Sequence, residues 1–184
     1  MSHRVKPKIP VQARAKKTKE SPSFKQTHTS KLRIDRGGKP EDVRVIGKFE
    51  NPDSISLKFY FQHGHSGSFR AKRVIHTQTW NLWHRFLPYS NRGYYLGRTG
   101  IRYIETMIKK RGGKKVTVYT NQRDVLETLL KLNYSIKPSS QTPLKKLLNI
   151  PRNASLPKGK ALAKLVHTTP IVFMIDIEIE RELN

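Results

Sequence analysis

The spacing of apolar residues changes from one part of the chain to the next. Over residues 43–61, apolar and polar residues alternate on both sides of a turn at 51–53, which contains proline and aspartate. Alternation with a period of two is typical of strands that have one buried face, so this part of the sequence predicts a hairpin. Two further strands are predicted over residues 69–77 and 80–87.

A helical period replaces the alternation after the fourth strand. Apolar residues recur every three or four positions from Arg98 to Ile108, and two glycines at 112–113 end the run. A short strand at 116–120, a second helix and a final strand at 171–179 follow. The order β-β-β-β-α-β-α-β predicts a mixed, largely antiparallel sheet flanked by helices, in the α+β or α/β class.

Positive charge is in large excess throughout the protein. Its 184 residues include 37 lysines and arginines against 13 aspartates and glutamates, a net charge of +24. This balance predicts a polyanionic partner, which can be DNA, RNA or a nucleoprotein. The absence of cysteine excludes disulfides, thiolate catalysis and thiolate metal sites.

No part of the sequence predicts insertion into a membrane. No apolar run approaches the roughly 20 residues that cross a bilayer, and no apolar signal segment follows Met1. We therefore expect an intracellular protein, either cytoplasmic or associated with a nucleoid or a nucleoprotein. Import into an organelle is the alternative, because a start with so few acidic residues also suits a transit peptide. The oligomeric state is left open.

Residues 1–40 are predicted to be separate from the folded domain, which is expected over 41–184. They contain many cations, several prolines and few apolar residues, so burial does not offset the entropy of ordering them. We expect a disordered basic arm that lies along nucleic-acid phosphates. The candidate contacts in the arm are Arg14, Lys16, Lys17 and Lys19.

Two other basic segments are candidates for contact with the same partner. One follows the first predicted helix, and the other is an acid-free insertion at 137–170 that several prolines interrupt. The alternatives are that cations at a helix end respond to the helix dipole, and that the insertion is only a solvated excursion. The candidate contacts in these segments are Lys109, Lys110, Arg111, Lys114, Lys115, Lys145 and Lys146.

A glycine-bearing segment joins the fourth predicted strand to the first helix. A strand, a glycine-rich turn and a helix N-terminus together make an anion site, because the backbone N–H groups there have no intrahelical acceptor. The sequence of residues 92–98, R-G-Y-Y-L-G-R, resembles the acyl-CoA loop of the GNAT N-acetyltransferases, R/Q-x-x-G-x-G/A. Gly97 matches the second glycine of that pattern, and Tyr95 replaces the first.

The resemblance covers residues 80–137 and implies a fold, a cofactor and a site. The ending Asn133-Tyr134 of the second helix stands where the family has Gly-Phe. The resemblance implies a GNAT-like domain that binds acetyl-CoA or another acyl-CoA. The family uses a V-shaped cleft for this, between the strand before the loop and the strand after the helix. The residues implied for the cofactor are Arg92, Gly93, Tyr95, Leu96, Gly97, Arg98, Thr99 and Asn121.

The catalytic residues depart from the pattern of the family. Family members often have a tyrosine in the second helix that protonates the leaving thiolate, but residues 128–130 here are Thr, Leu and Leu. His84 and Tyr134 are the remaining candidates for proton transfer. Glu105 is predicted to face outward from its helix or along it.

Two functions are compatible with these observations. The first is an acyl-CoA-dependent N-acyltransferase that acts on or near a nucleic acid or nucleoprotein. The second is a non-enzymatic nucleic-acid-binding protein, ribosome-associated or a virion DNA-binding protein, on a GNAT-like scaffold. No metal site is expected, because the sequence offers no third ligand beside His63 and His65.

Overall fold

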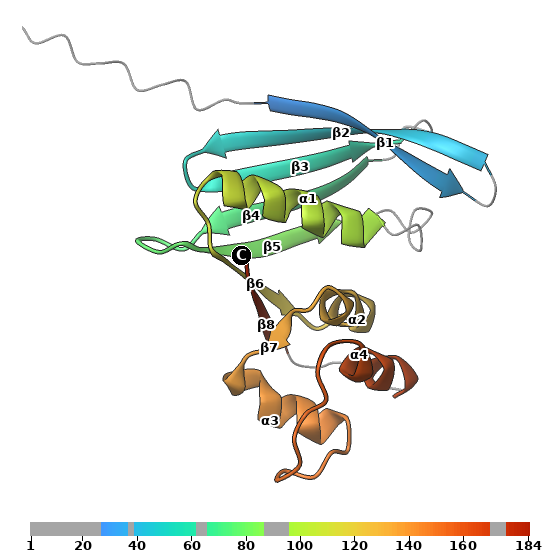
Figure 1. The fold of residues 1–184 in the computed structure, drawn as a ribbon, viewed down its shortest axis with the longest axis vertical. Helices are drawn as coiled ribbons and strands as arrows, with labels where there is room; N and C mark the ends of the chain where they lie inside the picture. Colours follow the sequence, from blue (N-terminus) through green and yellow to red (C-terminus); the bar gives the residue numbers. More distant parts are fainter. Residues whose placement is uncertain (1–26, 37–38, 62–65, 87–95, 170–175) are drawn as a thin grey trace, which may run out of the picture.

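One mixed sheet of eight strands runs through the described part of the protein (Figure 1). The structure is a computed structural model, and it describes residues 27–36, 39–61, 66–86, 96–169 and 176–184. The strand order is β1-β2-β3-β4-β5-β6-β8-β7. Among these strands, β5 and β6 form the one parallel pair, which confirms the predicted mixed, largely antiparallel sheet.

Five antiparallel strands build the first half of the sheet, and each pairs with the next along the chain. They are β1 (Thr27–Arg36), β2 (Lys39–Asn51), β3 (Ser54–Tyr60), β4 (Ser66–Arg73) and β5 (Thr79–Phe86). At the turn between β2 and β3, the backbone N–H of Asp53 donates to the side-chain oxygen of Asn51 at 2.9 Å. A side chain that hydrogen-bonds two residues on stabilises such a turn, and the predicted hairpin is confirmed.

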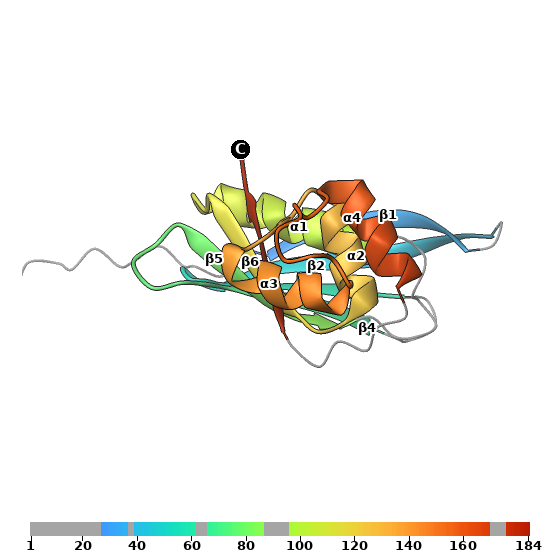
Figure 2. The ribbon, with the colours of Figure 1, turned by 90° about the horizontal axis from the view of Figure 1, so that it is seen from below.

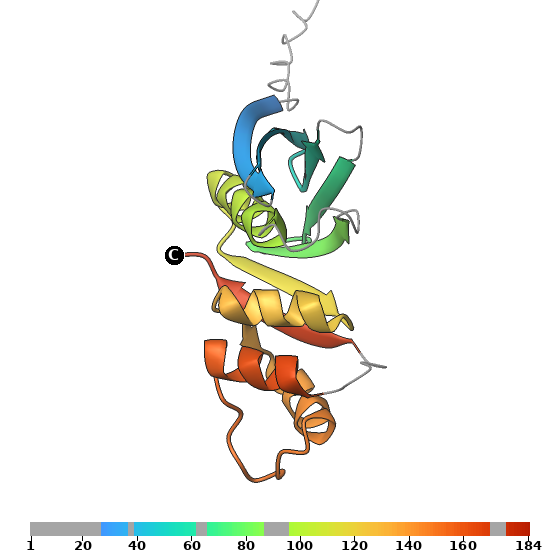
Figure 3. The ribbon, with the colours of Figure 1, turned by 90° about the vertical axis from the view of Figure 1, so that its right-hand side faces the viewer.

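The remaining elements alternate helices with strands. They are α1 (Leu96–Lys110), β6 (Lys115–Thr120), α2 (Arg123–Lys131), β7 (Ser135–Ile136), α3 (Pro138–Leu147), α4 (Gly159–Thr168) and β8 (Ile177–Glu182). Helix α1 leads from β5 to the parallel β6 and packs against β3 and β4, while α2 packs against α4 (Figure 2). Figure 3 shows the two halves of the sheet one after the other, with α1 beside the first and the other helices around the second.

The hydrophobic core lies between α1 and the first half of the sheet and continues to α2 and α4. The buried face of α1 includes Ile101, Ile104 and Ile108, none more than 2% exposed, as the helical spacing predicted. Gly100 allows the helix to approach β4 closely, because a Cβ atom there would lie 2.5 Å from the ring of Phe69.

Three described residues in the left-handed region follow helices. Gly112 (φ 72°) follows α1, Asn133 (φ 65°) follows α2, and Asn149 (φ 54°) follows α3. At the end of α2, the N–H of Tyr134 donates to the C=O of Leu129, and the N–H of Asn133 donates to the C=O of Leu130. Asn133 therefore adopts the left-handed conformation that glycine adopts most readily, and asparagine is among the few other residues that do so.

The predicted boundary of the disordered arm is wrong. Residues 27–36 form β1, which pairs with β2 along its whole length, and residues 39–40 belong to β2. This segment has a low apolar content, which led to the prediction of disorder. Its place in the sheet depends instead on backbone hydrogen bonds to β2, which any sequence without proline can form. The exposed Lys31 is typical of an edge strand, where a charge discourages further pairing. Residues 1–26 of the predicted arm lie outside the described residues.

Three other predicted boundaries also change. Strand β4 ends at Arg73, because a turn follows in which His76 has a φ of 60°. Helix α1 begins at Leu96, two residues before its predicted start. Strand β8 begins at Ile177, inside the predicted strand 171–179, and continues beyond it. The first part of that predicted strand lies outside the described residues.

Candidate functional site

The parallel strands β5 and β6 separate soon after they begin. Backbone pairing joins the first three residues of each strand and ends at Asn81 and Thr117. Strand β5 has eight residues and β6 has six, so the rest of both strands is unpaired on the facing edge in the described structure. Strand β6 stays paired with β8 along its whole length, and the sheet therefore divides here into two halves.

A β-bulge in β5 contributes to this separation. Arg70 of β4 lies opposite His84, and Ala71 lies opposite Leu82, so Trp83 is the extra residue on β5. A bulge bends its strand and increases the local twist, which turns the end of β5 away from β6. The side chain of Trp83 is 54% exposed, and the guanidinium of Arg70 lies 5.9 Å from the centre of its ring.

The guanidinium of Arg85 bridges the two strands where they separate. Its Nη1 donates to the C=O of Leu82 at 3.0 Å, and its Nη2 donates to the C=O of Tyr119 on β6 at 3.0 Å. Burial lowers the pKa of Arg85, although Tyr134 and Asp124 act in the opposite direction. No carboxylate among the described residues pairs with it, so this is a desolvated cation held by backbone carbonyls alone.

Three buried polar side-chain atoms of β5 have no hydrogen-bond partner in the described structure. Nε1 of Trp80 belongs to a side chain of the hydrophobic core, and the other two are Nε of Arg85, a donor, and Oδ1 of Asn81, an acceptor. Buried atoms of this kind are uncommon in folded proteins, and a bound ligand would account for the two atoms of Arg85 and Asn81. The sequence did not lead us to predict Arg85 as a site residue. The signal that could have indicated it is a cation inside the apolar run 80–87.

The N-termini of α1 and α2 lie at the same edge of the sheet, because these helices follow the carboxyl ends of the parallel strands β5 and β6. The first four N–H groups of α1, at residues 96–99, have no intrahelical acceptor and lie at the positive end of the helix dipole. Asn121 is exposed directly after β6. The structure therefore places these predicted cofactor residues at one edge. The predicted residues outside the described part are Arg92, Gly93 and Tyr95.

Solved structures of acetyltransferases are similar to this chain. Nourseothricin acetyltransferase has a TM-score of 0.51 and 11% identity, over 88% of this chain and 90% of that one. The fold is that of the GNAT N-acetyltransferases.

Among the other matches to this GNAT fold are two enzymes determined with their cofactor. One is a GNAT family acetyltransferase from Elizabethkingia anophelis with acetyl-CoA bound (TM-score 0.49, 11% identity, 71% of this chain and 77% of that one). The other is PaiA N-acetyltransferase from Thermoplasma acidophilum in complex with coenzyme A (TM-score 0.47, 12% identity, 71% of this chain and 62% of that one). No protein-family model and no curated protein matches the sequence.

Tyr134, one of the two catalytic candidates, is buried inside this GNAT fold. It is 2% exposed, and its hydroxyl donates to Oε1 of Glu105 at 2.7 Å. Burial raises the pKa of Tyr134 above its usual value of 10.0, and Glu105 raises the pKa further. A hydroxyl that is shielded from solvent and already bonded to a carboxylate has no access to a substrate, so the geometry supports a structural role.

The prediction that Glu105 faces outward from its helix or along it is wrong. The residue is 6% exposed, and Nη1 of Arg181 on β8 lies 3.4 Å from both carboxylate oxygens. The guanidinium of Arg181 also lies 5.9 Å from the centre of the Tyr134 ring. A carboxylate is tolerated in the interior when it is paired and hydrogen-bonded, so this cluster connects α1 with β8.

His84, the other catalytic candidate, lies at the bulge of β5, one residue before Arg85. Its backbone therefore borders the separation of the strands, whereas its side chain lies outside the described structure. Proton transfer by His84 stays a prediction.

The predicted basic residues at the end of α1 and directly after it lie far from the start of this helix. Helix α1 has 15 residues, so at about 1.5 Å per residue its ends are roughly 22 Å apart. Lys115 pairs with Glu180 and Glu182, and the hydrogen bond with Glu182 raises its pKa. Arg111 lies 4.2 Å from the centre of the Phe49 ring. The exposed members of this set are Lys109, Lys110 and Lys114. The candidates of the arm, outside the described residues, are Arg14, Lys16, Lys17 and Lys19.

No three His, Asp or Glu side chains among the described residues come together as a metal site. No helix in this part of the protein has the length and hydropathy needed to cross a membrane.

Proposed function

We propose that the protein is an acyl-CoA-dependent N-acyltransferase whose amine acceptor belongs to a nucleic acid or a nucleoprotein. The observation that carries the cofactor assignment is the separation of β5 from β6 at the edge where α1 begins. When bound, acyl-CoA supplies an acyl group that is activated as a thioester for attack by an amine. The family resemblance predicted a cofactor site between these two strands, and a GNAT fold supports it.

The residues at the separation fit a ligand that carries amides and phosphates. Oδ1 of Asn81 needs a donor, and the N–H of an amide group offers one. The N–H groups in the first turn of α1 have no intrahelical acceptor and suit phosphate oxygens, and Arg98 adds positive charge there. The protein therefore has polar groups for both chemical parts of the cofactor.

Arg85 and His84 are the residues that we assign to the reacting end. In a site shielded from water, Nε of Arg85 is a donor available to a developing oxyanion, because both Nη atoms already donate to the backbone. His84 is the neighbouring residue and is assigned the role of proton acceptor for the amine.

The charge of the protein selects the class of acceptor. A net charge of +24 repels cationic substrates such as lysine-rich protein tails. The same charge attracts an amine that is embedded in a polyanion. The acceptor that fits is therefore an amine on a nucleic acid or on a protein bound to one.

A second candidate function is a non-enzymatic nucleic-acid-binding protein on a GNAT-like scaffold. Two observations favour it. Leu129 and Leu130 belong to the core, at 0% and 1% exposure, so α2 presents leucine where the family often has a catalytic tyrosine. Arg85 also bridges the separation of the strands, so a ligand must share or displace its hydrogen bond to Tyr119.

Isothermal titration calorimetry with acetyl-CoA, in moderate salt to screen nonspecific charge effects, tests the first proposal. The wild-type protein is expected to release heat on binding, and Gly97→Asp is expected to abolish it, because a carboxylate then faces the phosphates. An acidic residue in a first helical turn favours the helix itself, so loss of the fold does not explain that result.

Thr106→Asp is the matched control, because it adds the same charge to an exposed position on the same helix. This position lies nine residues farther along α1, roughly 13 Å away, and binding is expected to persist. Absence of heat from the wild-type protein at millimolar acetyl-CoA refutes the acyltransferase proposal and favours the binding protein.

A further inference from the structure

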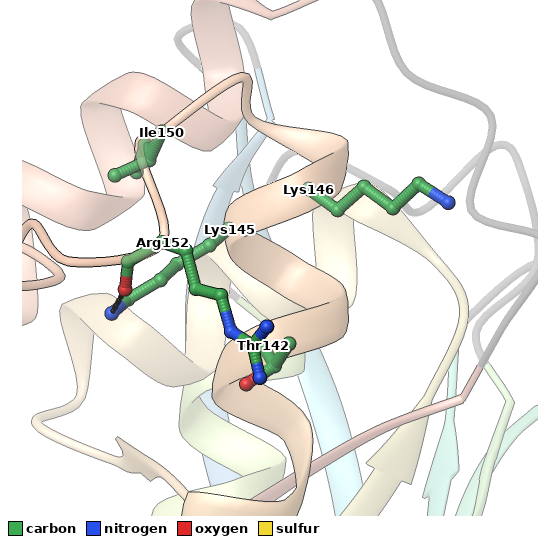
Figure 4. A pocket seen from close by; sticks show the side chains of 5 residues that line it. All are labelled: Thr142, Lys145, Lys146, Ile150 and Arg152. Carbon is green, nitrogen blue, oxygen red and sulfur yellow. Dashed lines mark hydrogen bonds between the residues drawn. The ribbon is translucent and has the colours of Figure 1, made fainter.

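The last turn of α3 and the loop after it form a basic pocket, which we name the α3 pocket. It has a volume of about 440 Å3 and is lined by Thr142, Lys145, Lys146, Ile150 and Arg152 (Figure 4). The guanidinium of Arg152 points toward Thr142, whereas Lys146 extends away from the other two cations. Its lining therefore combines three cations, a hydroxyl and an apolar side chain, with no carboxylate.

The cations of the α3 pocket have no acidic partner among the described residues. Residues 135–170 contain no aspartate or glutamate, and Nζ of Lys145 donates to the backbone C=O of Arg152 at 3.0 Å. A second pocket, of about 270 Å3 beside α1 and β8, differs in being lined by Glu105 and Glu182 as well as by cations. Carboxylates elsewhere pair with other lysines: Glu127 with Lys131, Glu178 with Lys137, and Glu182 with Lys115.

These cations do not cap the end of α3, although Lys145 and Lys146 lie in its last turn, where the helix dipole also favours positive charge. The end of α3 is closed by the backbone, because the N–H of Ile150 donates to the C=O of Lys145 at 2.9 Å. The N–H of Asn149, which has a φ of 54°, donates to the C=O of Lys146 at 3.3 Å. Arg152 lies beyond the helix, and Ile150 packs on the hydrophobic core, which holds the loop in place. The pocket is therefore a formed concavity that concentrates unpaired positive charge.

We propose that the α3 pocket binds a phosphate group of a single-stranded nucleic acid. Lys145 and Arg152 supply the charge for the phosphate, and Thr142 supplies a hydroxyl donor. A pocket of this volume accommodates one small group, and Ile150 offers an apolar contact for a sugar or a base, so a flexible strand fits better than a rigid duplex. This inference goes beyond the acyltransferase proposal and does not depend on it.

Fluorescence anisotropy with a fluorescein-labelled 12-nucleotide oligouridylate, repeated with oligothymidylate, tests the inference. The variant combines Lys145→Gln with Arg152→Gln. Each phosphate that a protein neutralises on a single strand contributes about 0.7 to the slope of log K against log salt, and the α3 pocket holds one phosphate. The variant is therefore expected to show a slope shallower by about 0.7 and an affinity about fivefold lower at 0.1 M salt.

The matched control combines Lys58→Gln with Lys72→Gln, two exposed residues on β3 and β4, and removes the same charge at a distance from α3 along the sequence. Its affinity is expected to stay within about twofold of the wild-type value, because neither lysine contacts the strand. Equal losses in both variants overturn the proposal, since binding then follows total charge. Failure of the wild-type protein to bind either oligonucleotide overturns it as well.

Two further measurements distinguish a phosphate site from a folding defect and from a cofactor site. Circular dichroism establishes whether the double variant folds. If it does not fold, the single variant Arg152→Gln, at an exposed position, is expected to lower affinity in the same direction, by up to about fivefold. Acetyl-CoA calorimetry on the variant is expected to match the wild-type result, whatever that result is. Loss of acetyl-CoA binding with unchanged oligonucleotide affinity assigns the pocket to the cofactor's phosphates and refutes the proposal.

Discussion

Replacement of Tyr134 by phenylalanine separates a structural role from a catalytic role for this residue. The change removes one hydroxyl and leaves the ring in place. In the wild-type protein this hydroxyl donates to the buried carboxylate of Glu105 at 2.7 Å, and Arg181 contacts the same carboxylate at the longer distance of 3.4 Å. The variant therefore keeps the packing and leaves a buried carboxylate with one weak contact.

The expected loss of stability follows from the burial of both partners. A hydrogen bond to a charged group contributes about 1.5–3 kcal/mol, and loss of a partner for a buried acceptor lies in the same range. Tyr134 is 2% exposed and Glu105 is 6% exposed, so water does not replace the lost donor. We expect the free energy of unfolding to fall by about 2 kcal/mol.

Urea unfolding, monitored by fluorescence of the buried Trp80, measures this difference. Tyr119→Phe is the matched control, because the hydroxyl of Tyr119 also donates to a glutamate, Glu178, at 2.7 Å. Tyr119 is 47% exposed, so water replaces the lost donor and the expected cost is below about 1 kcal/mol.

The difference in stability is also expected to depend on pH. Burial and the contact with Glu105 raise the pKa of Tyr134 above 10.0, so above this pH the unfolded protein releases the proton and the folded protein retains it. The stabilisation is complete below pH 10 and is lost above it, at about 1.4 kcal/mol per pH unit. The wild-type protein and the variant are expected to differ by about 2 kcal/mol in the free energy of unfolding at pH 7. This difference is therefore expected to vanish at about pH 11.5.

Two results would refute this reasoning. If Tyr134→Phe costs no more than Tyr119→Phe, the buried hydrogen bond does not support the fold. If the variant keeps its stability but loses acyl transfer, Tyr134 takes part in catalysis.

Three further predictions concern packing, ion pairing and the N-terminal segment. Gly100→Ala is expected to lower the free energy of unfolding by up to about 2 kcal/mol, because crowding against Phe69 costs about 1–3 kcal/mol and the helix preference of alanine offsets only about 1 kcal/mol. Phe69→Leu in the same protein should recover part of the loss in a double-mutant cycle. Burial acts to raise the pKa of Glu178, but hydrogen bonds from Lys137 and a tyrosine lower it overall. Glu178→Gln is therefore expected to cost up to about 1 kcal/mol at pH 7 and nothing once the pH falls well below 4.5, as urea unfolding across this range will measure. Deletion of residues 1–26, which leaves β1 intact, is expected to flatten the dependence of oligonucleotide affinity on salt; an unchanged slope contradicts phosphate contacts by this segment.

Local patterns in the sequence were sufficient for most of the secondary structure. The alternation over 43–61 determined the β2–β3 hairpin, because a strand buries every second residue when one face meets the core. The helical spacing of α1 and the position of Asn133 after α2 were equally readable, since burial and backbone conformation act within a few residues. Strand β1 was missed, because its place in the sheet depends on pairing with β2 and its own sequence has little apolar content.

The sequence by itself also predicted the GNAT-like order of elements, the net charge and the anion-binding start of α1, all of which depend on neighbouring residues or on composition. Only the tertiary structure decided where charged side chains far apart in the sequence meet. In the folded protein, Arg85 donates a hydrogen bond to the carbonyl of Tyr119 between the separating strands. Glu105 is buried in contact with Tyr134 and Arg181. These contacts join residues 29 to 76 positions apart, and the path of the folded backbone rather than local preference sets such distances.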